Sequence, residues 1–255
     1  GAVQHYLSTP QVNVQISSDT LSLPEIARLV PALNGVALRP AFELRLNGPL
    51  DGLGVDMNVR SSAGQVTGQL VADVQTPGQA VRGSLRLRHL DLAPLLKDPS
   101  LASDLTADLT ADLTSASFSD LESLRGRVAV QSPRVALVGY AADAVSAQAR
   151  IEGRRAVVEA RATAYGAGLT ARGPVTIPLG SEPLAFDLRG RVAHANLAAL
   201  PRALKVPSAR TNITADYHAS GRLPNQAAAR NVVADLRLDD SLVPGAHIAA
   251  GSTVG

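Results

Sequence analysis

The feature that most constrains this chain of 255 residues is the alternation of apolar and polar residues with a period of two. In segments such as 42–46 and 213–219, every second residue is apolar and the residues between are mostly polar. Successive side chains of a strand point to opposite faces of a sheet, so this pattern predicts strands with one apolar and one polar face. Turn sequences such as Asn47-Gly48-Pro49 and Glu152-Gly153 separate the segments and suit antiparallel hairpins. The alternating segments are 12–16, 42–46, 55–59, 66–74, 85–87, 128–130, 135–137, 145–151, 158–164, 184–192, 213–219 and 232–238.

A second feature is a sequence motif that recurs along the chain, which we call the phrase. A short stretch rich in Leu, Ala and Pro, for which we predict a short helix, occurs at 21–29, 90–96 and 196–204. Each copy precedes an alternating segment, at 41–46, 105–113 and 213–219 respectively. Recurring units of this kind stack on their neighbours and extend a surface in one direction. The repeat therefore favours a long groove or platform over a compact catalytic pocket.

No Gly/Ser-rich or Pro-rich linker divides the chain, and its composition does not shift along its length. We therefore expect residues 1–255 to form one continuous, repeat-built segment. The chain has no initial Met and no polar capping element at either end, so we also expect it to be an excerpt of a longer protein. Three short helices cannot cover the apolar face of such a sheet. The sheet must pack on itself as a sandwich, curl into a barrel or trough, or hold an apolar ligand.

Composition disfavours several classes of function. Hydrophobic residues make up 45% of the chain, but aromatic residues only 3%, and there is no Trp. Carbohydrate modules and proteins that bind single-stranded nucleic acid rely on aromatic platforms, which this chain lacks. A net charge of +2 without a Lys/Arg tract gives no nucleic-acid footprint. With no Cys, disulfides, thiol catalysis and Cys-based metal sites are excluded, and no apolar run approaches the ~20 residues that span a bilayer.

Candidate chemistry is equally sparse. The run 104–113 places Asp104, Asp108 and Asp112 four residues apart. In a strand that spacing is about 13 Å, too far for two carboxylates to share a metal or act as an acid and base pair, so we predict a solvated strand face. The His residues are scattered, no Ser lies in a Gly-x-Ser-x-Gly elbow, and the Gly-x-Gly turns lack the third Gly of a dinucleotide site. We therefore predict no catalytic residue, no cofactor and no metal, and a protein that is not an enzyme.

The repeated phrase resembles the AsmA-like and TamB-like proteins of the Gram-negative cell envelope. The resemblance lies in Leu-x-Leu-x-x-hydrophobic stretches such as 90–96, in the strand 124–130 with its Gly followed by alternating Val residues, and in the strand 169–174 that ends in Gly-Pro. It covers nearly the whole chain and consists of residue classes without invariant positions. The family has no catalytic residues to carry over.

The resemblance implies a mainly β fold, in which a long antiparallel sheet curls into an elongated hydrophobic groove with a few short helices. It implies a periplasmic protein, anchored in the inner membrane by a segment not present here. The implied function is outer-membrane biogenesis through phospholipid transport between the inner and outer membranes, support of outer-membrane protein assembly, or both, a role linked to protein secretion. The implied partners are phospholipid acyl chains, both membranes through parts outside this segment, and outer-membrane assembly proteins, with no nucleic acid.

An acyl chain needs an apolar wall without polar interruptions, and alternating strands supply such a wall along one face. Each buried CH₂ group contributes about 0.8 kcal/mol, so specific contacts are not required. The alternative is that the same residues fill the dry core of a structural or adhesive sandwich without a lipid ligand. The residues alone leave both open, and the resemblance favours the groove. The candidate groove-lining residues are Phe42, Leu44, Leu46, Leu85, Leu87, Leu109, Leu113, Phe186, Leu188, Ile213, Tyr217, Leu236 and Leu238.

Overall fold

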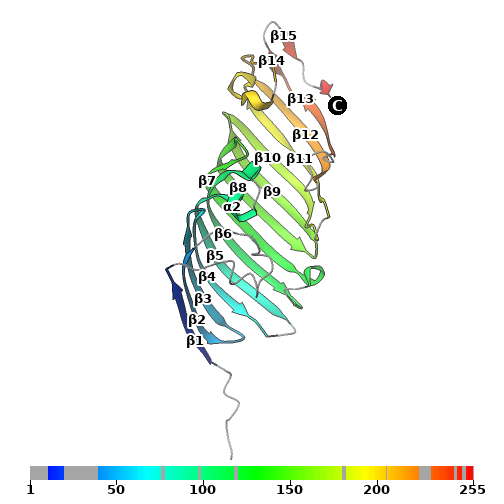
Figure 1. Ribbon diagram of the computed structural model, residues 1–255. Coiled ribbons are helices and arrows are strands. Elements are labelled where there is room, and N and C mark those ends of the chain that lie inside the picture. The colour runs from blue at the N-terminus through cyan, green and yellow to red at the C-terminus, as the bar shows by residue number, and fades with distance from the viewer. Residues whose placement is uncertain are drawn as a thin grey trace, which may run out of the picture. The chain divides into compact units, whose positions relative to one another are not determined.

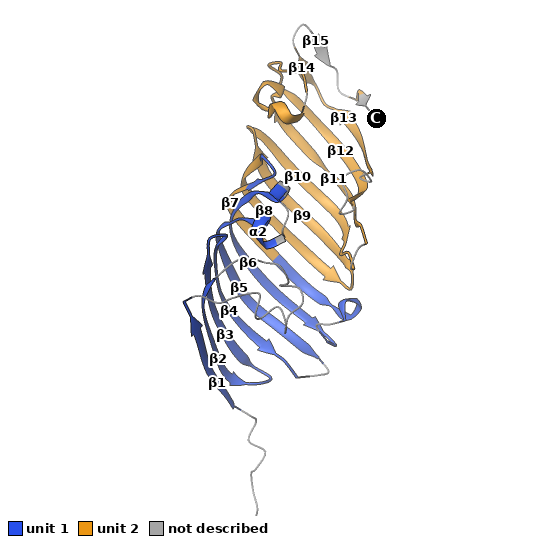
Figure 2. Cartoon of the chain, in the orientation of Figure 1, with its two compact units in different colours: residues 1–128, 136–139 blue, residues 129–135, 140–255 orange. Residues whose placement is uncertain are grey.

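A computed structural model describes most of the chain and shows a mainly β protein with a long antiparallel sheet, as the alternation predicts (Figure 1). The described residues are 11–19, 40–75, 78–96, 99–117, 120–179, 182–204, 206–223, 231–243, 246–248 and 251–254. The chain divides into two compact units, residues 1–128 with 136–139 (unit 1) and residues 129–135 with 140–255 (unit 2), coloured separately in Figure 2. That residues 1–255 form one continuous groove segment stays a prediction.

Unit 1 is built from strands that each pair antiparallel with the next along the chain. The short connections β2–β3 and β3–β4 are tight turns, whereas β5 and β6 are joined through helical turns. The elements are β1 (Gln11–Ser18), β2 (Ala41–Pro49), β3 (Leu53–Ser61), β4 (Gly64–Asp73), β5 (Gln79–Leu90), α2 (Leu92–Leu96), η2 (Pro99–Leu101), β6 (Ser103–Ser115) and η3 (Leu121–Ser123). Strand β7 (Arg125–Leu137) contributes residues to both units.

Unit 2 follows the same scheme, with antiparallel pairing between successive strands from β8 to β13. Strand β16 (Thr253–Val254) adds a short pairing to β13, and β14 (Ser241–Val243) pairs with β15 (Ala246–Ile248) in a separate hairpin. The main elements are β8 (Tyr140–Glu152), β9 (Arg155–Ala164), β10 (Ala167–Thr176), β11 (Leu184–Ala195), η4 (Leu197–Ala199), η5 (Arg202–Leu204), β12 (Ile213–Leu223) and β13 (Asn231–Leu238).

The apolar side chains of each unit pack sideways along the sheet. In the described residues, the main contacts of each strand are with its neighbours in the sheet and with short flanking elements. The buried hydrophobic residues of this part are mostly alanines, such as Ala107 and Ala215, joined by Leu53 and Ile151 at about 9% exposure or less. A core of large, fully buried aliphatic side chains is therefore not found in the described part of either unit.

The two Leu/Ala/Pro stretches that lie within the described residues form short helical turns of two kinds. The copy at 90–96 contains α2, as predicted, and the copy at 21–29 lies outside the described residues. The copy at 196–204 forms two separate 3₁₀ turns, η4 and η5, where a single helix was expected. Pro201 explains the break, because the residue before a proline is disfavoured in helical conformation, and Leu200 has an extended ψ of 148°.

The strands that enter these two described copies end in the same distortion. The register of β5 against β6 shifts between Leu87 and Leu90, and that of β11 against β12 shifts between Val192 and Ala195. In each bulge a histidine takes a positive φ, 50° at His89 and 60° at His194. Its N–H donates to a threonine hydroxyl on the next strand, at 3.1 Å and 3.2 Å. A β-bulge of this kind bends the strand and redirects the chain out of the ladder.

The turns that follow also share their hydrogen bonds. In the first copy, the Asp91 carboxylate accepts from the Ala93 and Ser103 N–H groups at 3.1 Å and 3.0 Å. In the second, the Asn196 side chain accepts from Ala198 and Thr211, both at 3.2 Å. The hydroxyls of Ser103 and Thr211 accept from the first helical N–H groups at 2.7 Å and 2.9 Å. The recurring phrase therefore specifies one recurring turn, in which Asp and Asn, or Ser and Thr, serve interchangeably.

Candidate functional site

The thirteen candidate groove-lining residues all lie on strands of the described structure, seven in unit 1 and six in unit 2. Every one of them is half-buried, neither enclosed in a core nor fully exposed. Those of unit 1 come from β2, β5 and β6, and those of unit 2 from β11, β12 and β13. We call the apolar sheet face on which they lie the wall of each unit.

In unit 1 the pairing registers bring these residues into continuous rows. One row runs across five strands as Leu44, Met57, Gly68, Leu85 and Leu109, each opposite the next. Side chains directly opposite on neighbouring strands share a face and contact each other. The alternation at 55–59 predicts that Met57 lies on the apolar face, but Met57 is not among the candidate groove-lining residues. The register, which the sequence does not reveal, adds it to the wall.

Large aliphatic side chains of the unit 1 wall lie over glycines on the neighbouring strand. A Cβ at Gly68 would lie 2.4 Å from Leu85 Cδ2 and 3.1 Å from Met57 Cγ. A Cβ at Gly83 would lie 2.8 Å from Leu70 Cδ2. Each glycine thus leaves space that a long neighbour fills, so these side chains pack closely along the sheet.

The wall of unit 2 uses smaller residues. One of its rows runs Ala160, Ala171, Gly190, Tyr217 and Leu236 across β9 to β13. Here the aromatic side chains take the place that leucines hold in unit 1, since Tyr217 reaches over Gly190 and Phe186 lies 3.2 Å from the position of a Cβ at Gly221. An apolar hollow of about 390 Å³ opens above the alanines, and we call it the Tyr217 hollow.

The opposite face of unit 1 carries ion pairs between β5 and β6. Arg82 contacts Asp112 at 2.8 Å, Arg86 contacts Asp108 at 2.6 Å, and His89 lies 3.0 Å from Asp104. The hydrogen bond from Arg86 to Asp108, and the attraction between their charges, raise the pKa of the arginine. All these side chains are more than half exposed, so the acidic run forms the solvated strand face that the sequence predicts.

A second hollow, of about 470 Å³, lies among polar residues of unit 1. Its lining comes mostly from two adjacent polar rows of β2 to β6, with members such as Arg45, Asp56, Gln69 and Arg86. These residues alternate with the wall residues along each strand, so the hollow opens on the face opposite the wall. A hollow of this character suits water and polar groups and is unsuited to an acyl chain.

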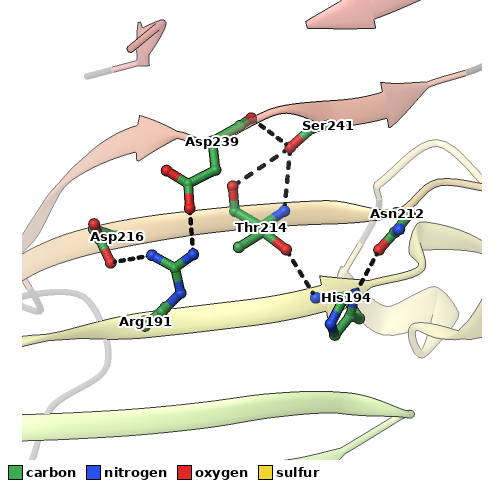
Figure 3. A network of polar contacts seen from close by, with 7 residues as sticks. All are labelled: Arg191, His194, Asn212, Thr214, Asp216, Asp239 and Ser241. Carbon is green, nitrogen blue, oxygen red and sulfur yellow. Dashed lines mark hydrogen bonds and ion pairs between the residues drawn. The ribbon is translucent and has the colours of Figure 1, made fainter. Parts of the chain in front are cut away.

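Unit 2 carries a polar network where β11, β12 and β14 meet (Figure 3). Arg191 forms ion pairs with Asp216, at 3.0 Å, and with Asp239. Hydrogen bonds to Asp239, which has the larger effect, and to Asp216 raise the pKa of the arginine. Close by, the buried Ser241 hydroxyl donates to the Asp239 carbonyl at 2.8 Å and accepts from the Thr214 N–H at 3.2 Å. These bonds tie β14 to β12. In this network the carboxylates are paired with a cation and the serine hydroxyl bonds to backbone groups, so the arrangement is structural.

The described residues contain no group of three or more His, Asp or Glu side chains placed to hold a metal ion. None of the helices within them has the length and apolar character needed to cross a membrane.

Comparison with known proteins yields no relative. No family model, no curated protein and no solved structure matches this chain.

Proposed function

We propose that this chain is a non-enzymatic segment of a cell-envelope protein whose apolar sheet face contacts phospholipid acyl chains. The observation that carries the proposal is the wall itself, a set of large apolar side chains that remain half-buried on strands whose main contacts are lateral. Contiguous apolar patches that a soluble protein leaves accessible to solvent mark interaction sites or ligand-binding grooves.

The chemistry of the wall favours a hydrocarbon ligand. Along each strand the polar side chains point away from the wall, so an acyl chain meets no unsatisfied donor or acceptor on it. Contacts along such a wall are apolar and undirected, so each CH₂ group gains about 0.8 kcal/mol wherever it is buried. A chain can therefore shift along the wall without passing a high barrier, while its headgroup remains in water.

The remainder of the proposal rests on the resemblance to the AsmA-like and TamB-like proteins. On that basis the segment lies in the periplasm of a Gram-negative cell and belongs to a protein anchored in the inner membrane. It takes part in phospholipid transport between the two membranes, in outer-membrane protein assembly, or in both. A curled, continuous groove extending through the whole chain is part of the same proposal.

Photo-crosslinking from matched positions tests the proposal. Benzoylphenylalanine is introduced at Leu109 on the wall or at Thr110, the next residue, whose side chain is exposed on the other face. The pair Leu188 and Arg189 repeats the comparison in unit 2. After incubation with vesicles of radiolabelled phosphatidylethanolamine, irradiation should attach lipid at Leu109 and Leu188 only.

Equal labelling at wall and opposite positions, or none at the wall, contradicts the proposal. Circular dichroism of each substituted protein shows whether the sheet is retained. A folded protein whose wall positions are unlabelled favours the dry structural or adhesive repeat.

A further inference from the structure

The Tyr217 hollow has a lining that differs from the rest of the described wall. It is formed by small residues of β9 and β10, with Leu169, Val192 and Tyr217 at its sides. Its volume of about 390 Å³ falls within the range of about 300–1,000 Å³ that is typical of ligand sites. The alanines at positions 160, 162 and 171 leave this space open, whereas the corresponding part of the unit 1 wall is filled by Leu and Met side chains.

Tyr217 bounds the hollow in a defined orientation. Its ring starts on β12 and crosses Gly190 of β11, and its hydroxyl donates to the Thr170 carbonyl of β10 at 2.9 Å. A Cβ at Gly190 would lie 1.8 Å from the Thr170 carbonyl oxygen and 2.7 Å from the tyrosine hydroxyl oxygen, so the glycine makes room for the close approach of β10 and for this crossing. The hydroxyl is thus satisfied by the sheet, and the ring is held down along it.

The hollow offers an occupant neither charge nor a free hydrogen-bonding group. Burial raises the pKa of Tyr217, which keeps the phenol neutral at physiological pH. Arg161 and Thr170 border the hollow, but they alternate with the alanines along their strands and direct their side chains to the other face. An uncharged, apolar lining matches a hydrocarbon chain and repels any polar group that would lose its hydration there.

We propose that Tyr217 is a specificity-determining residue, which sets the width of the hollow so that it accepts one unbranched acyl chain of a phospholipid and rejects bulkier chains. This inference rests on the proposed function of the wall. With the hydroxyl bound to Thr170, the ring closes the side of the hollow toward β12. Removing the ring joins the hollow to the space above Gly190 and widens it.

A single tryptophan locates the acyl chain. The chain has no native Trp, so a Tyr217→Trp variant reports only from the hollow. Mixed with vesicles of dibrominated phosphatidylcholine, its fluorescence should be quenched relative to vesicles of the unbrominated lipid. Phe42→Trp reports in the same way from the unit 1 wall, and Thr110→Trp, which is exposed on the opposite face of β6, is the control expected to stay bright.

Quenching at the three positions distinguishes a failure of the inference from a failure of the proposed function. Quenching of Phe42→Trp without quenching of Tyr217→Trp overturns the inference and leaves the proposed function standing. Absence of quenching at both wall positions overturns the proposed function, and the inference with it. Equal quenching at all three positions indicates nonspecific adsorption and counts against both.

Substitutions of Tyr217 test specificity itself. Tyr217→Ala should raise the binding of a phospholipid with a pyrene-labelled acyl chain relative to a saturated straight-chain lipid, in a competition assay. Tyr217→Phe keeps the ring but loses the hydrogen bond, so its preference should lie between those of wild type and Tyr217→Ala. Unchanged preference in Tyr217→Ala, in a protein that retains its circular dichroism spectrum, overturns the specificity role.

Discussion

The walls of the two units arise from the same alternation of apolar and polar residues but differ in how completely their side chains fill the surface. In unit 1, Leu, Met, Val and Phe side chains stand opposite one another and extend over glycines, so the surface is filled. In unit 2, alanines and glycines occupy much of one row, and an aromatic ring bounds the hollow that results. The period of two fixes which face is apolar, whereas residue size decides whether that face is filled or hollowed.

The two described turns, in contrast to the walls, share their backbone geometry and their hydrogen bonds. Both described copies have a bulge with a positive-φ histidine, a capping Asp or Asn, and a Ser or Thr hydroxyl that accepts from the first helical N–H group. Backbone geometry at these turns is therefore more closely shared than the packing of the walls. The repeat therefore keeps the geometry of the turn constant and varies the size of the wall side chains.

The largest expected effect comes from replacing, in each unit, a glycine at which the neighbouring strand approaches closely. A Cβ at Gly83 would lie 2.2 Å from the Gln69 carbonyl oxygen, and one at Gly173 would lie 2.0 Å from that of Asp187, each at φ +154°. We expect Gly83→Ala and Gly173→Ala each to lower the free energy of unfolding by about 3 kcal/mol. Urea denaturation measures the change.

The matched control for the second variant lies on the same strand. Gly168 has no positive φ, and its nearest contact for a Cβ is 3.9 Å away, so Gly168→Ala should leave stability almost unchanged. A Gly173→Ala protein as stable as Gly168→Ala would show that the close approach of β10 and β11 is absent in solution.

Reciprocal changes of size sharpen the contrast between the walls. Leu85→Ala empties part of the unit 1 wall, and because Leu85 is half-buried we expect a loss of about 1–2 kcal/mol in the free energy of unfolding. Ala171→Leu adds a side chain to the Tyr217 hollow, where space exists, and should cost nothing or stabilise slightly. Thermal unfolding of the two variants and wild type compares these effects. A larger loss of stability in Ala171→Leu than in Leu85→Ala would contradict a filled wall in unit 1 and a hollow in unit 2.

The shared turns can be compared by deleting one hydroxyl in each. Ser103→Ala and Thr211→Val remove the acceptors of the Leu92 and Leu197 N–H groups. Both hydroxyls are partly buried, so we expect each variant to lower the free energy of unfolding by about 1 kcal/mol. The losses in the two variants should be nearly equal. Chemical denaturation of both variants under one set of conditions gives the ratio, and a loss confined to one copy would refute the equivalence of the turns.

The smallest expected effect is a pH dependence confined to unit 2. Burial raises the pKa of Tyr217 above its usual value of about 10, so the neutral phenol stabilises the fold. This contribution is complete below the pKa of the unfolded chain and disappears as pH rises through the pKa of the folded state. Between about pH 9 and pH 11, wild type should therefore lose more stability than Tyr217→Phe. Parallel loss in the two proteins would exclude this role of the residue.

Much of the fold follows from the sequence because alternation and turn residues act locally. The segment 105–113 shows this, since its leucines fall on the wall of β6 while Asp108 and Asp112 pair with arginines on the other face. The split of residues 196–204 into two 3₁₀ turns departs from the predicted single helix, although Pro201 signals the break in the sequence. The segments 128–130 and 135–137 belong to one strand, β7, which continues through Pro133.

The candidate site was less accessible from the sequence because it depends on register. The rows that join Met57 to Leu85 through Gly68, or Gly190 to Tyr217, link residues far apart in the chain. Alternation says which face a residue occupies, but not which residue on the next strand lies opposite. For the same reason the polar hollow of unit 1 and the apolar hollow of unit 2 leave no local signal in the sequence.

The central claim, that the wall contacts lipid, is tested most directly by mass spectrometry of organic extracts from the purified chain. The account predicts phospholipid in stoichiometric amount from wild type and from Thr110→Asp, which places a charge on the exposed face. It predicts loss of that lipid from a folded Leu109→Asp protein, which places the charge on the wall. A well-folded wild-type protein that yields no phospholipid would contradict the claim.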